Sequence, residues 1–362
     1  MAERQRQLAI GLMSGTSMDG IDAAVIETDG DSVFAMGAAI SVPYGDEFRT
    51  RLRGIVGVDP QGNAEAASVA EDLTRQHAAA VERLLGEAGL SAGDVSLIGF
   101  HGHTVLHRPD EGFTCQIGDG AQLAKQTGVP VINDFRTKDM AAGGEGAPLA
   151  PVYHVALTRT LERPVAVLNV GGVANVTWVS PDGGATAFDT GPGNALLDDW
   201  IQAKTGDSMD AGGKLARAGN VDETALTQLI DNPYFARLYP KSLDRDDFSF
   251  DSLEHLSVED GAATLVEFTA AAVDIASHML PAPPLRWLVT GGGRHNAAIM
   301  AALRRRLGAP VEPVEAEGWR GDALEAQAFA YLAVRSYYGL PLSYPQTTGV
   351  ERPVSGGVRH NP

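Results

Sequence analysis

Short apolar runs alternate with longer segments of helical periodicity along the chain. Apolar, β-branched runs bounded by Gly, Asp or Pro predict strands, which we expect at Leu8–Met13, Ile21–Thr28, Ser96–Phe100, Val129–Asn133, Val165–Val170, Val173–Val179 and Leu285–Thr290. Apolar residues at helical spacing predict helices, which we expect at Glu65–Leu85, Ala195–Lys204, Gly261–Leu280, Asn296–Leu307 and Ala323–Tyr338. Because some strands have no helix after them, the pattern predicts an α/β fold with mixed sheets.

One strand–turn–strand pattern occurs twice. Leu8–Thr28 and Val165–Val179 each contain two strands around a glycine turn, and they begin roughly 155 residues apart. This internal repeat predicts two similar lobes, each of which begins with a β-hairpin whose turn faces a cleft between the lobes. We expect lobe I at residues 1–135, with a tail of about 340–362 returning to it, and lobe II at 136–339. Gly, Ala and Pro at 139–151 predict a hinge or mobile loop, and the tail from Thr347 is expected to be loosely ordered.

Composition narrows the class of protein. With 362 residues the chain is long enough for two domains, and its net charge of −18 disfavours nucleic acids and anionic membrane surfaces as partners. Cys115 is the only cysteine, so an internal disulfide and a Cys-rich zinc site are excluded. The first apolar stretch is too short for a signal peptide, and no run approaches the ~18 apolar residues of a membrane span. We therefore expect a cytoplasmic protein.

The first hairpin turn, Ser14–Gly20, is a candidate phosphate site. It offers backbone N–H groups without large side chains, three hydroxyl groups and the carboxylate of Asp19. Such a loop can wrap phosphate oxygens while the carboxylate holds a hydrated Mg²⁺. Taken alone, the segment is more typical of a hairpin turn without a ligand.

Two further glycine turns strengthen the nucleotide hypothesis. Gly171-Gly172 lies between two predicted strands, and Gly291-Gly292-Gly293 follows a strand and precedes a helix, where an anion can approach closely. Complete motifs of the P-loop and the dinucleotide-binding fold are missing. Two phosphate hairpins with a strand–glycine–helix element resemble the actin, Hsp70 and hexokinase group, in which ATP lies between two lobes.

Other side chains admit two interpretations each. Asp189 ends a short strand and could be a general base or could cap the following helix. Arg136 could clamp a carboxylate or sugar hydroxyl, although a surface arginine is the default. Glu325 lies among alanines on a predicted helix, where a carboxylate is usually a solvated residue of the helix face. His101 and His103 share one face if the backbone is extended, as in the H-x-H pair of metal-dependent amidohydrolases, although a second ligand pair is missing.

Eight segments, in order from Gly11 to about Ala333, resemble the anhydro-N-acetylmuramic acid kinases. They are GLMSGTSMDGIDAA, GFHGHTVLHRP, QIGDGAQLA, VINDFRTKDMAAGGEGAPLAP, LNVGGVANVT, FDTGPGN, VTGGGRHN and GDALEAQAFAYLA. The resemblance implies an ATP-dependent kinase of peptidoglycan recycling. It would add water to open the bridge of 1,6-anhydro-N-acetylmuramic acid and phosphorylate O6, giving N-acetylmuramic acid 6-phosphate and ADP. An ATPase that drives partner binding would explain the hairpins but not Asp189.

The resemblance also implies roles for individual residues. Asp189 is expected as the base that activates water, Asp19 is expected near Mg²⁺ through water, and a homodimer is expected. The expected ATP contacts are Gly15, Thr16, Ser17, Met18, Asp19, Gly20, Ile21, Asp22, Gly171, Gly172, Gly291 and Gly292. The expected sugar contacts are Arg136, Glu325 and His101. His103 departs from the family's H-G-Q-T segment, where Gln is expected, and its effect on sugar binding is open.

Overall fold

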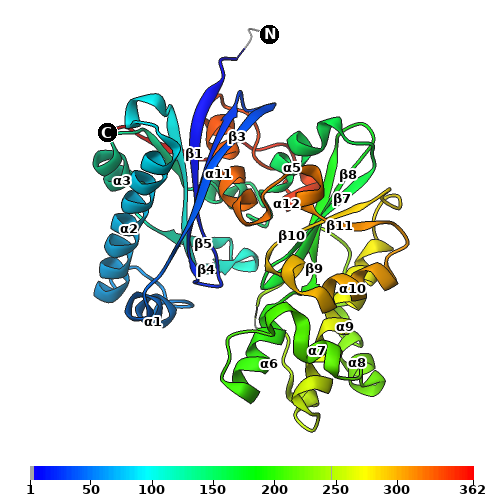
Figure 1. The fold of residues 1–362 in the computed structure, drawn as a ribbon. Helices are drawn as coiled ribbons and strands as arrows, with labels where there is room; N and C mark the ends of the chain where they lie inside the picture. Colours follow the sequence, from blue (N-terminus) through cyan, green and yellow to red (C-terminus); the bar gives the residue numbers. More distant parts are fainter. Residues whose placement is uncertain (1–3, 246) are drawn as a thin grey trace. The chain divides into compact units, whose positions relative to one another are not determined.

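The computed structural model describes residues 4–245 and 247–362. The chain forms two compact units. Unit 1 consists of the chain up to Leu157 together with Ala323–Pro362, and unit 2 consists of Thr158–Asp322. Each unit is built around its own mixed β-sheet (Figure 1).

The sheet of unit 1 has seven strands. Its main path is β12 (Val358–His360), β6 (Val131–Asn133), β4 (Leu97–Arg108), β1 (Gln7–Ser14), β2 (Gly20–Thr28) and β3 (Val33–Pro43), and β5 (Phe113–Ile117) pairs with β4. Strands β1, β2 and β3 are antiparallel neighbours. Strands β1, β4 and β6 run parallel to one another. This half-parallel arrangement explains why only some strands are followed by a helix.

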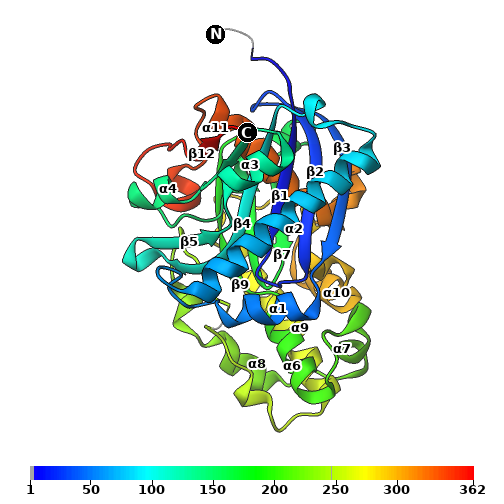
Figure 2. The ribbon, with the colours of Figure 1, turned by 90° about the vertical axis from the view of Figure 1, so that its left-hand side faces the viewer.

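Helices cover both faces of this sheet. On one face α2 (Ala64–Ala88) packs with α1 (Asp46–Gly54) and α3 (Gly120–Thr127), and Figure 2 shows α2 crossing in front of the strands. On the other face α11 (Leu324–Tyr337) lies against β1, β2 and β4. A Cβ atom on Gly11 would lie 1.7 Å from the carbonyl oxygen of Ala326, and one on Gly99 would lie 2.1 Å from that of Phe329. Glycine at these strand positions therefore permits the close approach of α11.

Unit 2 has a five-stranded sheet in the order β11 (Val311–Pro313), β10 (Trp287–Thr290), β7 (Val165–Val170), β8 (Val173–Val179) and β9 (Ala185–Pro192). Strands β7, β8 and β9 are antiparallel, and β7, β10 and β11 are parallel. The core forms between this sheet and the helices α6 (Ala195–Thr205), α7 (Lys214–Ala218), α8 (Glu223–Ile230), α9 (Val258–Ser277) and α10 (Ala297–Arg306). Trp200 of α6 and Phe268 of α9 are fully buried in it.

The two sheets share one topology. The order β3-β2-β1-β4-β6 in unit 1 corresponds to β9-β8-β7-β10-β11 in unit 2, with the same parallel and antiparallel neighbours. The predicted α/β class, the mixed sheets and the repeated hairpin are confirmed. The duplicated topology gives each unit a similar mixed sheet, as the repeated hairpin predicts.

The unit boundaries differ from the predicted lobes, which divided at 135/136 and 339/340. The chain changes units after Leu157 and again after Asp322. The reason is packing in unit 1: α5 (Pro151–Leu157) contacts α11, and the Tyr153 hydroxyl donates a hydrogen bond to Gln327 Oε1 at 3.0 Å. Residues 136–157 and 323–339 therefore belong to unit 1, as does the tail from 340.

Two segments that the sequence predicts as loose are held by specific bonds. In the tail, β12 pairs with β6, and Ser343 forms a β-bridge with Val354. In the segment 139–151, the buried Asp139 carboxylate accepts bonds from the Gly146 N–H at 2.7 Å and the Thr348 hydroxyl at 2.6 Å. Neither the hinge at 139–151 nor the loose tail is found.

Candidate active site

The first hairpin turn connects β1 to β2 and presents its tip to solvent. Met18, with a φ of 56°, donates its N–H to the Gly15 carbonyl at 3.0 Å and closes the turn. Thr16, Ser17 and Asp19 are exposed. The Arg49 side chain holds the turn in place by donating a hydrogen bond to the Met18 carbonyl at 3.2 Å. Exposed hydroxyls and a carboxylate on an anchored turn are suited to phosphate and Mg²⁺.

Not every glycine of this turn is required for the same reason. A Cβ atom on Gly15 would meet only Ser17 Oγ at 3.7 Å, an ordinary contact. A Cβ atom on Gly20 would lie 2.3 Å from the Val42 carbonyl oxygen of β3. Packing therefore explains Gly20 but not Gly15, so the bare backbone at Gly15 is free for a ligand to approach.

A bulge in β4 separates the two histidines of the H-x-H pattern. Between the pairings with β1, β4 carries one extra residue, and Gly102 there adopts a left-handed φ of 73°. His101 packs its ring on Phe329 of α11, with 4.5 Å between ring centroids, whereas His103 bonds to Ser14. The expectation that they share one face of an extended strand is wrong. Within 4–245 and 247–362, no cluster of three or more His, Cys, Asp or Glu is arranged to hold a metal ion.

Arg136, His101 and Glu325 come together in unit 1. Arg136 donates to His101 Nε2 from Nε at 3.2 Å and from a terminal nitrogen at 2.9 Å, and its other terminal nitrogen donates to the Gly146 carbonyl at 2.7 Å. Burial and the Arg136 charge hold the pKa of His101 well below its ordinary value, so the ring is neutral and accepts these bonds. Burial lowers the pKa of Arg136 to about 10, opposed by the charges of Glu325 and Asp139.

Glu325 lies in the first turn of α11 and influences this cluster through its charge. Its side chain keeps exposed surface, yet the surrounding protein removes enough water to raise the pKa of its carboxyl group. The charge of Asp22 raises this pKa further, and Arg136 opposes the shift. The sequence-predicted sugar residues therefore do lie together, beside Asp22 of the predicted ATP set. Chemically, the group offers a cation and a carboxylate, whereas both ring nitrogens of His101 are already bonded, to the Gly102 carbonyl at 3.0 Å and to Arg136.

The second hairpin turn, Gly171-Gly172, is braced by backbone atoms. At the start of α6, the N–H groups of Gly193 and Ala195 donate to the Gly172 carbonyl at 2.9 and 3.2 Å, and that of Asn194 donates to the Gly171 carbonyl at 2.7 Å. A Cβ atom on Gly193 would lie 2.2 Å from the Gly171 oxygen, so glycine is required there. A Cβ atom on Gly172 would meet Ala195 Cβ at 3.5 Å, an ordinary contact. Packing does not explain Gly172.

The third glycine turn follows β10 as predicted, but a short 3₁₀ helix (Gly292–His295) separates it from α10. The first amides of α10 bond to the Asn296 side chain, so they are not open to an anion. Gly291, with a φ of 77°, and Gly293 both lie too close to Val170 for a side chain. A Cβ atom on Gly292 would meet only Asn194 Nδ2 at 3.4 Å. Of these three glycines, Gly292 has the most room.

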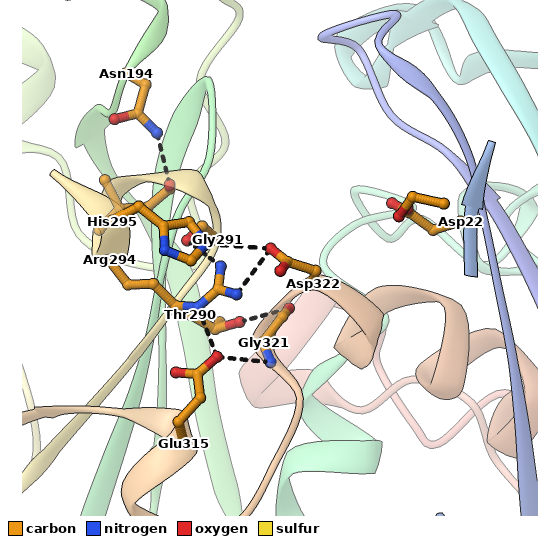
Figure 3. A network of polar contacts seen from close by, with 11 residues as sticks. Asp22, Asn194, Thr290, Gly291, Arg294, His295, Glu315, Gly321 and Asp322 are labelled. Atoms are coloured by element: carbon orange, nitrogen blue, oxygen red, sulfur yellow. Dashed lines mark hydrogen bonds and ion pairs between the residues drawn. The ribbon is translucent and has the colours of Figure 1, made fainter. Parts of the chain in front are cut away.

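Arg294 holds this glycine turn in place (Figure 3). Its guanidinium group donates to the Gly291 carbonyl at 2.9 Å and pairs with Glu315 at 2.9 Å and with Asp322 at 2.7 Å. Glu315 also accepts the Gly321 N–H at 3.1 Å. Burial is the largest influence on the pKa of Asp322 and would raise it, but the hydrogen bonds and charges of Arg294 and His295 together outweigh burial, so the pKa is lowered. The network fixes both the turn and the end of unit 2.

Asp189 lies within β9 and is surrounded by the segment 234–243. Its N–H donates to the Lys241 carbonyl at 3.1 Å, and its carboxylate accepts the Leu243 N–H at 2.9 Å. The Tyr234 hydroxyl donates to the Asp189 carbonyl at 2.6 Å. Asp189 thus makes no cap for α6, whose N-cap residue is Asn194. A half-buried carboxylate fixed by a backbone amide can accept a proton from a positioned water molecule.

Lys241 is a buried cation beside Asp189. The residue is 3% exposed, and its ammonium group donates to the Tyr234 carbonyl at 3.3 Å and lies 4.4 Å from the centre of the Tyr234 ring. Burial lowers the pKa of Lys241 to about 8, aided by Arg237 and opposed by Asp189. Sequence analysis assigned no role to Lys241 or Tyr234, because their segment shows no periodic pattern. The signal available was a lone lysine close to Tyr239, in a loop that also carries Asp244 and Asp247.

Comparisons with known proteins cover almost the whole chain. The family model of the anhydro-N-acetylmuramic acid kinases matches residues 7–361. The chain belongs to the anhydro-N-acetylmuramic acid kinase family. The curated kinase of this name from Rhodospirillum rubrum is 57% identical over 352 residues, covering 97% of this chain and 93% of the relative. That from Paramagnetospirillum magneticum is 56% identical over 358 residues, covering 98% and 100%.

The family assignment shows that the protein is an enzyme, a phosphotransferase that uses ATP and acts on a sugar. Among solved structures, the activator of the 2-hydroxyisocaproyl-CoA dehydratase from Clostridium difficile aligns with a TM-score of 0.45 and 13% identity, over 91% of this chain and 97% of the other. That likeness is too distant to carry an argument. Among the described residues, no helix is long and apolar enough to cross a membrane.

Proposed function

We propose that this anhydro-N-acetylmuramic acid kinase couples two reactions on one sugar. It adds water to open the 1,6-anhydro bridge and transfers the γ-phosphoryl group of ATP to O6, giving N-acetylmuramic acid 6-phosphate and ADP in the recycling of peptidoglycan. The observation that carries the proposal beyond the family name is the setting of Asp189. Its carboxylate is fixed by the Leu243 amide, in a strand that carries none of the three glycine turns.

The chemistry explains why a carboxylate is needed apart from the phosphate turns. O6 is part of the bridge and has no proton to lose, so a base cannot activate it directly. Asp189 instead removes a proton from water as the water oxygen bonds to the anomeric carbon, and the bond from that carbon to O6 breaks. The electron pair of the broken bond stays on O6, which then attacks the γ-phosphorus atom and releases ADP.

The glycine turns supply the groups that bind phosphates. In unit 1, residues Gly15 to Asp22 offer amides and hydroxyls, and in unit 2 the positions with room for a ligand are Gly171, Gly172 and Gly292. Gly291 would contribute backbone atoms next to them. The exposed carboxylate of Asp19 suits a hydrated Mg²⁺, because hard cations prefer oxygen ligands. When bound, Mg²⁺ neutralises phosphate charge during transfer.

Arg136, Glu325 and His101 are the proposed sugar contacts. The sugar carries a lactyl carboxylate and an acetamido group, which call for a cation and for hydrogen-bonding partners. Burial lowers the pKa of Arg136 to about 10, because its guanidinium group loses contact with water. In the described part of the chain, no carboxylate lies within ion-pair distance of this group. A substrate carboxylate would supply the missing charge. His101 holds the guanidinium in place through its Nε2 atom.

The enzyme's location and assembly are further parts of the proposal. A cytoplasmic location agrees with a chain that has one cysteine and so cannot depend on an internal disulfide. The homodimer is proposed from the family resemblance. Sedimentation of the purified protein tests it directly, because a mass near 38.0 kDa would identify a monomer.

Replacing Asp189 tests the proposed mechanism. Asp189→Asn keeps the size of the side chain but removes the base, so kcat should fall by about 10²-fold or more. The measurement is sugar-dependent release of ADP, with Asp207→Asn, a substitution at an exposed residue, as the matched control. Near-normal turnover by Asp189→Asn in a folded protein would remove Asp189 from the chemistry.

A further inference from the structure

We propose that His103 is a positioning residue for the phosphate turn, defined as residues 14–20, and acts by accepting the hydroxyl hydrogen of Ser14. The inference rests on the proposed function of that turn in binding ATP. It gives the departure from the family's expected Gln a role in nucleotide binding instead of sugar selection.

The hydrogen bonds around Ser14 have a definite direction. The Tyr44 hydroxyl donates to Ser14 Oγ at 2.7 Å, and Ser14 Oγ lies 2.9 Å from His103 Nδ1. Because Ser14 has one hydrogen to give, it donates to Nδ1, and the neutral ring carries its hydrogen on Nε2. The reverse direction would leave the Tyr44 hydrogen without an acceptor, whereas Nε2 of His103 lacks a partner among the described residues in both directions. The hydrogen bonds therefore run from the Tyr44 hydroxyl through the Ser14 hydroxyl to the His103 ring.

This series of hydrogen bonds holds both ends of the phosphate turn in place. Ser14 is the last residue of β1, where the turn begins, and it is 1% exposed. At the other end, the backbone N–H of Tyr44 donates to the Asp19 carbonyl at 3.0 Å. Tyr44 thus binds the first end through its hydroxyl and the last end through its backbone. His103 completes the brace, because its Nδ1 fixes the direction in which the Ser14 hydroxyl points.

Among the described residues, His103 makes no hydrogen bond with the proposed sugar contacts. The bulge at Gly102 turns it away from His101, which faces Arg136 and α11. His103 is fully buried, and its Nε2 atom has no hydrogen-bond partner among the described residues. Burial lowers its pKa to about 4, so the ring stays neutral at neutral pH. Ser14 is the hydrogen-bond partner of the His103 side chain among the described residues, so the side chain transmits its effect through Ser14.

Four variants test the inference, with kcat and the KM of each substrate as readouts. His103→Ala should raise the KM for ATP about five- to tenfold, the value of one lost hydrogen bond, and leave the KM for the sugar unchanged. His103→Gln should restore most of the loss, because an amide oxygen can accept from Ser14. Ser14→Ala removes the same bond from the other side and serves if His103→Ala does not fold. His154→Gln, at a buried histidine of α5, is the matched control.

Two readouts separate this inference from the proposed function. Gly15→Val places a branched side chain on the phosphate turn itself; if it leaves the KM for ATP unchanged, the turn does not bind ATP and the proposed function fails. If Gly15→Val raises that KM but His103→Ala and Ser14→Ala do not, the inference alone is overturned. A change in the sugar KM instead would make His103 a specificity residue. Nitrogen NMR of the histidine rings should show Nδ1 of His103 without hydrogen, and a hydrogen on Nδ1 would contradict the assigned direction.

Discussion

The two hairpin turns occupy equivalent positions in the two sheets but are braced by different means. In unit 1, buried side chains hold the turn, through the chain from Tyr44 to Ser14 and His103. In unit 2, backbone amides at the start of α6 hold the turn through the carbonyls of Gly171 and Gly172. The same topology therefore allows a hairpin turn to be held either by buried side chains or by backbone amides.

The difference determines which changes each turn tolerates. A turn that is held by backbone amides needs no particular side chain. It does need two backbone segments to approach closely, and it therefore depends on glycine, which has no Cβ atom. A side-chain brace tolerates more room around the backbone, but it depends on buried polar groups that must keep their charge state and their partners. Unit 1 should therefore be sensitive to pH, and unit 2 should be sensitive to any Cβ atom at the contact.

Acid should destabilise unit 1 before unit 2. Burial lowers the pKa values of His77, His103 and His154 in unit 1 to about 4, against about 6.5 in the unfolded chain. Below pH 6.5 these histidines bind protons in the unfolded chain but stay neutral in the folded unit. The free energy of unfolding therefore falls as the pH decreases from 6.5 towards 4. At pH 5 the loss is about 2 kcal/mol per histidine, or about 6 kcal/mol for three as an upper bound.

Hydrogen exchange at pH 7 and pH 5, corrected for the intrinsic rates, measures this difference unit by unit. The histidines of unit 2, His255, His278 and His295, are exposed, in contrast to the buried histidines of unit 1. Equal loss of protection in both units would contradict the distinction between the two braces.

A single methyl group should distinguish the glycines of the second turn. Gly193→Ala places a Cβ atom 2.2 Å from the Gly171 oxygen and should cost about 3 kcal/mol of stability. Gly172→Ala meets only an ordinary 3.5 Å contact and should change stability by no more than about 0.5 kcal/mol. Urea unfolding measures both. On the proposed function, Gly172→Ala should nevertheless raise the KM for ATP, and equal stability losses in the two variants would refute the backbone brace.

Removing the buried cation of unit 2 should have a smaller effect, of opposite sign on stability and activity. Lys241→Met relieves a buried charge and should stabilise the protein by about 1–2 kcal/mol below pH 8. The folded pKa of Lys241 is about 8 and lies below the unfolded value of 10.5, so the gain should shrink as the pH rises from 8 to 10.5. If the charge supports the Asp189 carboxylate, kcat should fall about tenfold. Thermal unfolding and turnover at pH 7 measure both effects, and a loss of stability would show that Lys241 is needed only for packing.

The sequence predicts the elements whose patterns are local. The strands Val165–Val170 and Val173–Val179 are found at the predicted bounds, and the long helix predicted at Glu65–Leu85 is found as Ala64–Ala88. Strand β3 was not predicted, because its small and partly exposed residues follow no clear alternation. The boundary at Leu157 was missed because α11 joins β1 across more than 300 residues, and local composition carries no trace of such a contact.

The candidate site divides in the same way. The glycine turns, Asp189 and the trio of Arg136, Glu325 and His101 were predicted from motifs, and their roles stay predictions. The trio does lie together in unit 1. Which glycines a ligand could need was not predictable, because Gly172 and Gly193 differ only in what surrounds them. The two faces of β4 were assigned wrongly because a bulge depends on pairing with β1, which the sequence of β4 alone does not contain.

The most direct test of the account is the mass of the sugar product together with the release of ADP. The protein is incubated with ATP, Mg²⁺ and 1,6-anhydro-N-acetylmuramic acid, and parallel reactions omit the sugar. The account predicts that ADP appears only with the sugar and that each product molecule has gained one water and one phosphoryl group. ADP release at the same rate without the sugar, or a product that has gained the phosphoryl group but no water, would contradict it.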